Sequence, residues 1–112
     1  MKNTIRFICL YKDRYVKEDG SIIIKDLLKE TPCWTISHET KIPHLIREFE
    51  FSDFASSLEF VNQVGVDSDK QDHHPKIVLE WGLVRVEWWT HSIGGLHIND
   101  FIMAFRCDRI YE

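Results

Sequence analysis

The sequence lacks the long apolar run that a membrane-spanning helix needs, because no stretch approaches about 20 consecutive apolar residues. It also lacks an excess of positive charge. The formal net charge of −4 argues against non-specific nucleic-acid binding, which requires a basic face. Charged residues interrupt the apolar residues near the N-terminus, and no small-residue cleavage site follows them. We therefore expect neither a membrane span nor a secretory signal.

Cysteine is also scarce, and the cysteines have no pairing pattern. Cys9, Cys33 and Cys107 are odd in number, and no two of them have the spacing of a zinc ribbon or a thioredoxin motif. This favours free thiols in a reducing, cytoplasmic setting. Apolar residues make up 44% and charged residues 29% of the chain, which argues against disorder. A chain of 112 residues is long enough for one domain with a modest core.

The patterning divides the chain into two parts. Residues 1–20 alternate only briefly before a polar loop, and we interpret them as a variable N-terminal extension. Residues 21–112 hold the clear signals of secondary structure and form the domain. Ser21 is a suitable N-cap for a helix over 21–30. Pro32 ends that helix, because a proline disfavours helical backbone at the residue before it.

Four strands are predicted from alternating side chains. A short strand at 34–36 is expected to pair with an antiparallel strand over 45–51. Two further strands, 77–81 and 84–91, form a hairpin with its turn at Gly82-Leu83. Alternation in the second arm places Val84, Val86 and Trp88 on one face, and Arg85, Glu87, Trp89 and His91 on the other.

Two more helices complete the predicted architecture. Ser52 or Asp53 caps the first, and its last turn is expected to be lost in the polar run 67–71. Gly65 suggests a close helix contact, and the second of these helices has Asp100 in its first turn. The order of elements predicts an α+β two-layer sandwich, in which a four-stranded antiparallel sheet has three helices packed on one face. The apolar stripe of the first of these two helices is Phe54, Leu58, Val61 and Val64.

Histidines are concentrated near the end of that stripe, in the stretch Asp72-His73-His74-Pro75. Adjacent histidines converge poorly on one ion, and no i, i+4 pair or cysteine set assists them, so zinc is disfavoured. Acid–base catalysis requires only imidazoles within hydrogen-bond reach of a substrate proton. From spacing alone, an acid–base enzyme and a binding module are equally supported. The remaining histidines are interpreted as surface, core or capping residues: His38, His44 and His97.

The stretch Asp72-His73-His74-Pro75, followed at set spacings by Trp81, His91 and Asp100, resembles the signature of the pterin-4a-carbinolamine dehydratases. The similarity extends over about residues 21–110. It implies dehydration of 4a-hydroxytetrahydropterin (4a-hydroxytetrahydrobiopterin) to quinonoid dihydropterin, a step of tetrahydrobiopterin recycling. It also implies that no metal or bound cofactor is required.

The resemblance assigns expected roles to the site residues. His73 and His91 are the acid–base candidates, and His74 contacts and positions the pterin. Asp72 or Asp100 orients the imidazoles or holds the pocket. Trp81 is expected to bind substrate as well.

The sequence departs from the family at Ile77, where an aromatic is frequent, and at Asn99, where a basic residue is frequent. These departures bear on pterin packing and affinity. Some members also act as dimerisation partners of a homeodomain transcription factor, and an assembly chaperone on the same fold is a third alternative. The resemblance further implies a homo-oligomer, dimer or tetramer, with cytoplasmic and possible nuclear location and no direct contact to nucleic acid or membrane. The side chains then available to a partner are Phe54, Leu58 and Val61.

Overall fold

The computed structural model describes residues 27–112, so the predicted extension 1–20 and the beginning of the predicted helix 21–30 lie outside the described residues. Residues 27–30 are helical, and the helix ends before Pro32 as predicted. No helix in the described part of the chain has both the length and the apolar character needed to cross a membrane. The other elements are β1 (Thr35–Ser37), β2 (His44–Glu50), α3 (Phe54–Gln71), β3 (Lys76–Glu80), β4 (Leu83–Trp88), the 3-10 helix η1 (His91–Ile93) and α4 (Ile98–Tyr111).

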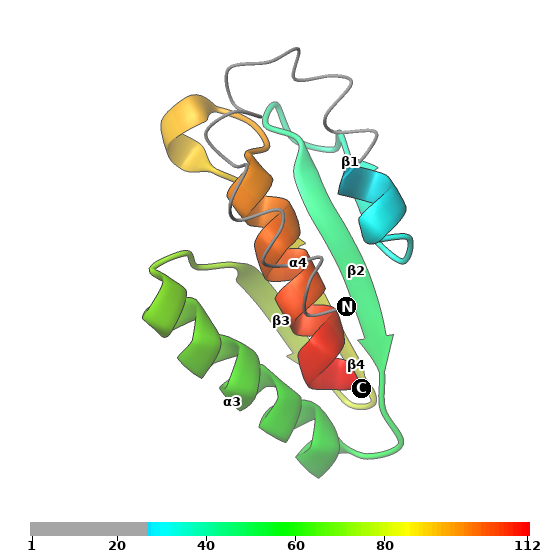
Figure 1. Ribbon diagram of the computed structural model, residues 1–112. Helices are drawn as coiled ribbons and strands as arrows, with labels where there is room; N and C mark the ends of the chain where they lie inside the picture. The colour runs from blue at the N-terminus through cyan, green and yellow to red at the C-terminus, as the bar shows by residue number, and fades with distance from the viewer. Residues whose placement is uncertain (1–26) are drawn as a thin grey trace.

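The four strands form one antiparallel sheet in the order β1-β2-β4-β3. Helices α3 and α4 lie on one face of this sheet, α4 over β2 and β4 and α3 over β3 and β4 (Figure 1). The predicted α+β two-layer sandwich is therefore confirmed.

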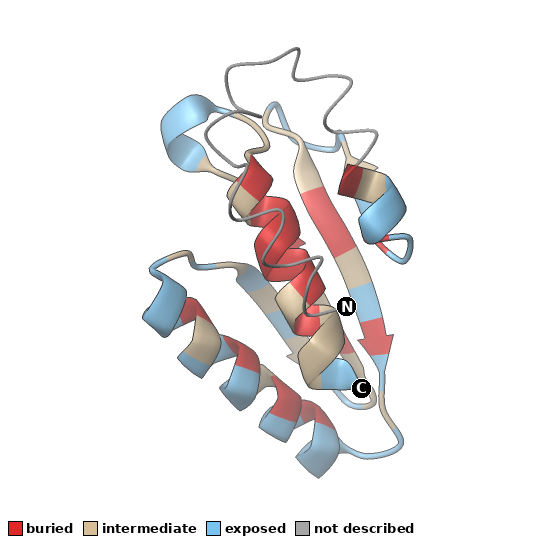
Figure 2. Cartoon of the chain, in the orientation of Figure 1, coloured by how far each residue is buried: buried red, intermediate tan, exposed pale blue. Residues whose placement is uncertain are grey.

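Alternation along β4 determines the core face of the sheet. Val84, Val86 and Trp88 are fully buried, as their predicted common face requires. In the adjacent strand β2, Leu45 lies opposite Trp88 and Phe49 lies opposite Val84. Most residues of α4 between Ile98 and Cys107 are buried as well (Figure 2). The core thus lies between the sheet, mainly β2 and β4, and the helices α3 and α4.

The hairpin between β3 and β4 turns at Trp81-Gly82, one residue earlier than predicted. Gly82 has a φ of 74°, and a Cβ there would lie 3.2 Å from the carbonyl oxygen of Phe51. The backbone of Phe51 in turn donates a hydrogen bond to the Gly82 carbonyl at 2.9 Å. Glycine is required at this position by both its backbone angle and this close approach.

The buried face of α3 differs from the predicted stripe. Phe54 is 44% exposed and Leu58 is 42% exposed, so the prediction that they face the core is wrong. The residues that α3 buries follow one another at spacings of three and four: Ser57, Phe60, Val64 and Ser68.

The apolar pattern of the sequence did not reveal this buried face of α3, because two of its four residues are serines. The Ser57 hydroxyl donates to the Asp53 carbonyl at 2.8 Å, and the Ser68 hydroxyl donates to the Val64 carbonyl at 2.7 Å. Because each hydroxyl is satisfied within its own helix, it can be buried at little cost. Asp53 is the N-cap of α3, and its carboxylate accepts a hydrogen bond from the Ser56 amide.

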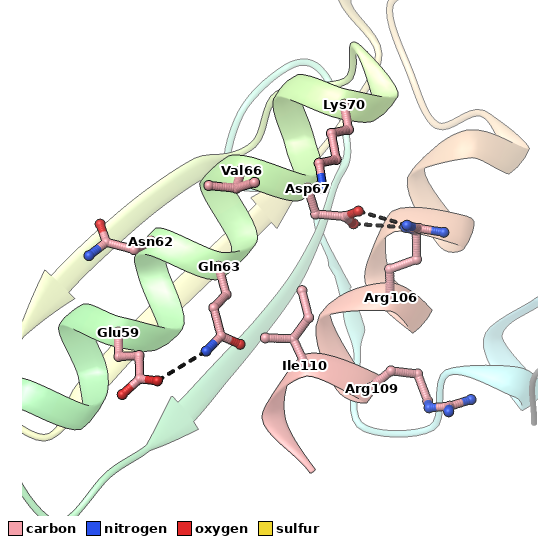
Figure 3. A pocket seen from close by; sticks show the side chains of 9 residues that line it. All are labelled: Glu59, Asn62, Gln63, Val66, Asp67, Lys70, Arg106, Arg109 and Ile110. Carbon is pink, nitrogen blue, oxygen red and sulfur yellow. Dashed lines mark hydrogen bonds and ion pairs between the residues drawn. The ribbon is translucent and has the colours of Figure 1, made fainter.

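Helix α3 also continues through the polar run that was expected to end it. Asp67 accepts two hydrogen bonds of 2.7 Å from the Arg106 guanidinium of α4, which joins the two helices (Figure 3). Ser68 is buried one residue later. Asp67 and Ser68, the first two residues of the polar run, therefore have partners inside the fold, and the helix extends to Gln71.

Gly65 of α3 is exposed, and a Cβ added there would meet nothing within 4 Å, so the expected close helix contact is wrong.

Replacing Gly65 with alanine is expected to raise the free energy of unfolding by about 0.5–1 kcal/mol, because glycine inside a helix loses more conformational entropy on folding. Urea denaturation measures this change. A destabilised Gly65→Ala variant would contradict the open environment of this position.

Candidate active site

The end of α3 places His73. Asp72 has a left-handed backbone with φ 53° and ψ 44°, and its amide donates to the Asp69 carbonyl at 3.2 Å. The amide of His73 donates to the Ser68 carbonyl at 3.1 Å. These two bonds form a Schellman motif, in which aspartate occupies the position that glycine usually takes. The chain leaves the helix abruptly here, and His73 is the first residue beyond the turn.

His73 pairs with Asp100. Its Nε2 lies 2.6 Å from Oδ1 of Asp100, whose side chain is fully buried. The imidazole lies nearly parallel to the ring of Trp88, with centroids 5.5 Å apart and planes 12° apart. Because a carboxylate only accepts hydrogen bonds, Nε2 is the protonated nitrogen of His73. Its Nδ1 has no hydrogen-bond partner within residues 27–112 and is the atom free for proton exchange.

Asp100 is fixed by the start of α4. Its Oδ2 accepts hydrogen bonds from the Thr90 hydroxyl at 2.8 Å and from the His97 amide at 2.9 Å. Nδ1 of His97 accepts in turn from the Asn99 amide at 3.1 Å, which completes a capping box. The buried carboxylate is thus held by three donors, and its orientation toward His73 is determined by the helix N-terminus. His97 caps the helix as the sequence indicated.

The other predicted site residues differ in how close they lie to the His73–Asp100 pair. His74 is exposed, and its Nε2 lies 2.9 Å from Oδ1 of Asp69. Asp72 is exposed at the helix end. Trp81, 72% exposed, lies in the hairpin turn at the far end of β3. At roughly 3.3 Å per residue, the five residues of β3 alone place about 17 Å between Trp81 and the histidines.

His91 does not lie on a strand, and the prediction that the hairpin arm extends to residue 91 is wrong. Strand β4 ends at Trp88, and Thr90 forms an isolated bridge with Gly95. This bridge closes a small loop that contains η1, and His91 is its first residue. His91 is exposed and directly follows Thr90, the residue whose hydroxyl contacts the buried carboxylate.

Some contributing residues were not identified from the sequence. Thr90 and Trp88 contact the His73–Asp100 pair directly. The spacing of His97 and Asp100 is the signal that could have identified the capping box. His44 lies on the other face of the sheet, 2.7 Å from Glu87. That contact depends on the register of β2 and β4, which no local pattern reveals.

Two hollows on the surface lie apart from His73. One of about 690 Å³ lies between α3 and α4, with Asp67 and Arg106 at one end of it (Figure 3). Another of about 430 Å³ lies on the open face of the sheet and includes His44 and Glu87. Neither is lined by any of the six predicted site residues. Among residues 27–112, no three histidine, cysteine or acidic side chains converge as they would around a metal ion.

Comparison with known proteins identifies relatives of the whole domain. The family model described as pterin 4 alpha carbinolamine dehydratase matches residues 22–110. A Chlorobium luteolum protein provisionally named pterin-4-alpha-carbinolamine dehydratase is 48% identical over 88 residues, which cover 79% of this chain and 77% of that protein. A Saccharophagus degradans protein with the same provisional name is 48% identical over 86 residues, covering 77% of this chain and 76% of the relative.

Solved structures share the fold. A transcriptional coactivator/pterin dehydratase from Brucella melitensis superposes with a TM-score of 0.73 at 27% identity, over 80% of this chain and 93% of that one. A pterin dehydratase-like protein described as a RuBisCO assembly factor of the alpha-carboxysome superposes with a TM-score of 0.59 over 70% of this chain and 88% of its own. At 19% identity, the second likeness concerns the fold alone.

Proposed function

Because this chain belongs to the pterin 4 alpha carbinolamine dehydratase family, we propose that it is a carbon–oxygen lyase that dehydrates 4a-hydroxytetrahydropterin to quinonoid dihydropterin. The substrate is proposed to be 4a-hydroxytetrahydrobiopterin, formed when aromatic amino acids are hydroxylated. The observation that supports this proposal is the His73–Asp100 pair. These residues stand near the beginning and at the end of the family signature in the sequence, and a hydrogen bond of 2.6 Å joins them in the structure.

The reaction requires one proton to be given and one to be taken. The hydroxyl on the 4a carbon leaves as water after it receives a proton, and the lone pair of the neighbouring ring nitrogen drives it out. That nitrogen then loses its own proton, so the balance is one water released and no net change in protons. Imidazoles suit both transfers, because their pKa lies near neutral pH.

His73 is proposed as one of the two proton-transfer groups. Asp100 holds Nε2 and stabilises the imidazolium that forms when Nδ1 takes a proton, as a buried carboxylate does beside a catalytic histidine. His91 is proposed as the second group. Which of the two gives and which takes the proton is left open in this proposal.

The remaining predicted residues are proposed to bind the pterin. His74 and Asp72 border His73 and are exposed, so both are accessible to a ring placed against it. Trp81 lies beyond the five residues of β3, which span about 17 Å at roughly 3.3 Å per residue. We propose that it joins the site only from a second copy of the chain, in a dimer or tetramer. The departures at Ile77 and Asn99 are proposed to alter pterin affinity rather than proton transfer.

The wild-type protein is expected to accelerate formation of quinonoid dihydropterin above its spontaneous rate. The measurement couples a phenylalanine hydroxylase reaction to stopped-flow detection of the quinonoid product. Heat-denatured protein provides the control for the spontaneous elimination. A rate equal to the spontaneous one, with folded protein at high concentration, would rule out the dehydratase proposal.

A second candidate function is binding of a protein partner, because α3 exposes several large apolar side chains: Phe54, Leu58 and Val66. A structural relative is described as a transcriptional coactivator as well as a dehydratase. We propose a cytoplasmic location for the enzyme and a nuclear one only where a transcription-factor partner is bound. The two functions are separable, since changes at Phe54 or Leu58 leave the His73 contacts untouched.

A further inference from the structure

A second histidine–carboxylate pair lies on the open face of the sheet, opposite the helices. Nδ1 of His44 is 2.7 Å from Oε1 of Glu87, and the guanidinium of Arg85 donates to Oε2 of Glu87 at 2.9 Å. Although Glu87 belongs to a strand face that no helix within residues 27–112 covers, its side chain is only 7% exposed and that of His44 only 12% exposed. A buried ionic pair rarely increases stability over apolar residues of the same size. Its presence therefore needs a reason other than packing.

The charge of Glu87 is maintained by its neighbours. Burial acts to raise the pKa of Glu87, but the hydrogen bond with His44 and the positive charges of Arg85 and Lys76 outweigh it and leave the pKa lowered. The carboxylate therefore stays ionised and holds the His44 ring in one orientation.

That orientation determines what His44 packs against. Its ring stacks on the indole of Trp89, with centroids 3.8 Å apart and planes 6° apart. Trp89 is the first residue after β4, where the strand no longer restrains its backbone. The stacked imidazole thus restrains an aromatic side chain that the sheet itself leaves half-buried.

Trp89 in turn contacts His91. The indole Nε1 donates a hydrogen bond to Nδ1 of His91 at 3.4 Å, and the two rings meet edge to face with centroids 5.0 Å apart. An indole nitrogen can only donate, so Nδ1 of His91 must be unprotonated in this contact. The proton of the neutral ring then lies on the other ring nitrogen, Nε2.

We propose that Trp89 is a positioning residue for His91: its indole N–H selects the Nε2-protonated form of that imidazole, and the His44–Glu87 pair holds the indole in place by stacking. The catalytic meaning of this inference rests on the proposed dehydratase function. The free edge of His91 then presents an N–H rather than a lone pair. In this form the free edge of His91 cannot take a proton, so of the two roles left open for the histidines the inference assigns to His91 the one that donates to the departing hydroxyl.

Nuclear magnetic resonance tests the contact without any substrate. Long-range proton–nitrogen spectra of the wild-type protein at a pH where His91 is neutral are expected to show Nδ1 unprotonated and Nε2 protonated. In Trp89→Phe, which keeps an aromatic ring for His44 but loses the donor, the Nδ1 and Nε2 resonances of His91 should shift toward those of a free imidazole that exchanges between tautomers. Unchanged His91 resonances in folded Trp89→Phe would overturn the proposal.

A pair of variants at residue 44 tests the stacking step independently, should Trp89→Phe fail to fold. His44→Phe preserves the parallel ring and is expected to retain the wild-type tautomer of His91. His44→Ala removes the ring and is expected to shift the His91 resonances in the same direction as Trp89→Phe. Equal His91 spectra in the two variants would overturn the role of stacking.

Kinetics then separates this inference from the proposed reaction. If the wild-type protein dehydrates the pterin, Trp89→Phe should lower kcat by roughly 10- to 100-fold, as loss of a supporting partner does, with a smaller change in KM. Wild-type kcat in Trp89→Phe would overturn the positioning role and leave the dehydratase function standing. An inactive wild-type protein would overturn the dehydratase function, while the tautomer measurement would still decide the Trp89–His91 contact.

Discussion

Replacing His73 with alanine is expected to lower the turnover number of the dehydration by roughly 10²–10⁴-fold, the usual contribution of a positioned acid–base group. The variant keeps Asp100 and the helix cap but removes the imidazole that lies 2.6 Å from that carboxylate. Because proton transfer belongs to the chemical step, kcat should fall far more than KM changes. The coupled assay for quinonoid dihydropterin gives both constants.

His38→Ala is the matched control for this experiment. His38 is exposed and lies in the turn before β2, apart from the Asp100 contacts, so its loss should leave kcat unchanged. His73→Ala also leaves the buried carboxylate without one of its donors, so its fold must be verified by circular dichroism at the assay temperature. Wild-type kcat in a folded His73→Ala protein would exclude His73 from proton transfer.

Replacing Asp100 with alanine is expected to lower the free energy of unfolding by roughly 3–5 kcal/mol. The buried carboxylate accepts from the Thr90 hydroxyl, the His97 amide and the His73 ring, and each stranded donor costs about 1–3 kcal/mol, partly relieved where water enters. Loss of a carboxylate in the first turn of α4 also weakens the helix N-terminus. Since the total free energy of unfolding of a native domain is about 5–15 kcal/mol, this loss of stability is severe.

Asp100→Asn separates stability from chemistry at this position. The amide keeps the shape and one accepting oxygen, so the stability loss should be clearly smaller than that of Asp100→Ala. It cannot accept at both positions, and it no longer stabilises an imidazolium at His73. Urea denaturation gives the stability of both variants, and the coupled assay gives their activity. An Asp100→Ala protein as stable as wild type would contradict the hydrogen bonds that the structure assigns to this carboxylate.

The sheet and its core face were predictable because they depend on local alternation. Val84, Val86 and Trp88 repeat with the period of a strand, and all three are fully buried. The start of α4 was equally accessible, since the carboxylate of Asp100 in a first turn is a local signal. The family resemblance also needed only the order and spacing of residues, and the family match over residues 22–110 confirms it.

The buried face of α3 was not predictable from hydrophobicity. Phe54 and Leu58 have the stronger apolar signal, yet Ser57 and Ser68 occupy the core because their hydroxyls are bonded within the helix. The same limit applied to the last helical turn, whose Asp67 is satisfied by a partner 39 residues away in the sequence. Such choices depend on tertiary contacts that a local pattern does not contain.

The candidate site was predicted in its central pair but not in its surroundings. Sequence spacing identified His73 and Asp100 as members of one site, and the structure joins them by a hydrogen bond. Sequence spacing did not indicate the His44–Glu87 pair, because that contact follows from the pairing of Leu45 with Trp88 across two strands. The predicted hairpin, with its turn at Gly82-Leu83, already implied that Trp81 lies at the opposite end of the strand from the histidines, and the structure shows this.

Trp88 and Trp89 are consecutive residues that project to opposite faces of the sheet, one against His73 and the other against His44. At this point the sheet is a single layer of backbone between two histidine–carboxylate pairs. Position on the open face of the sheet is consequently a poor guide to mutational tolerance in this region, because the side chains of His44 and Glu87 are largely buried there. In a library of variants selected for activity, substitutions on the outer surface around His44 are expected to be as restricted as substitutions in the core.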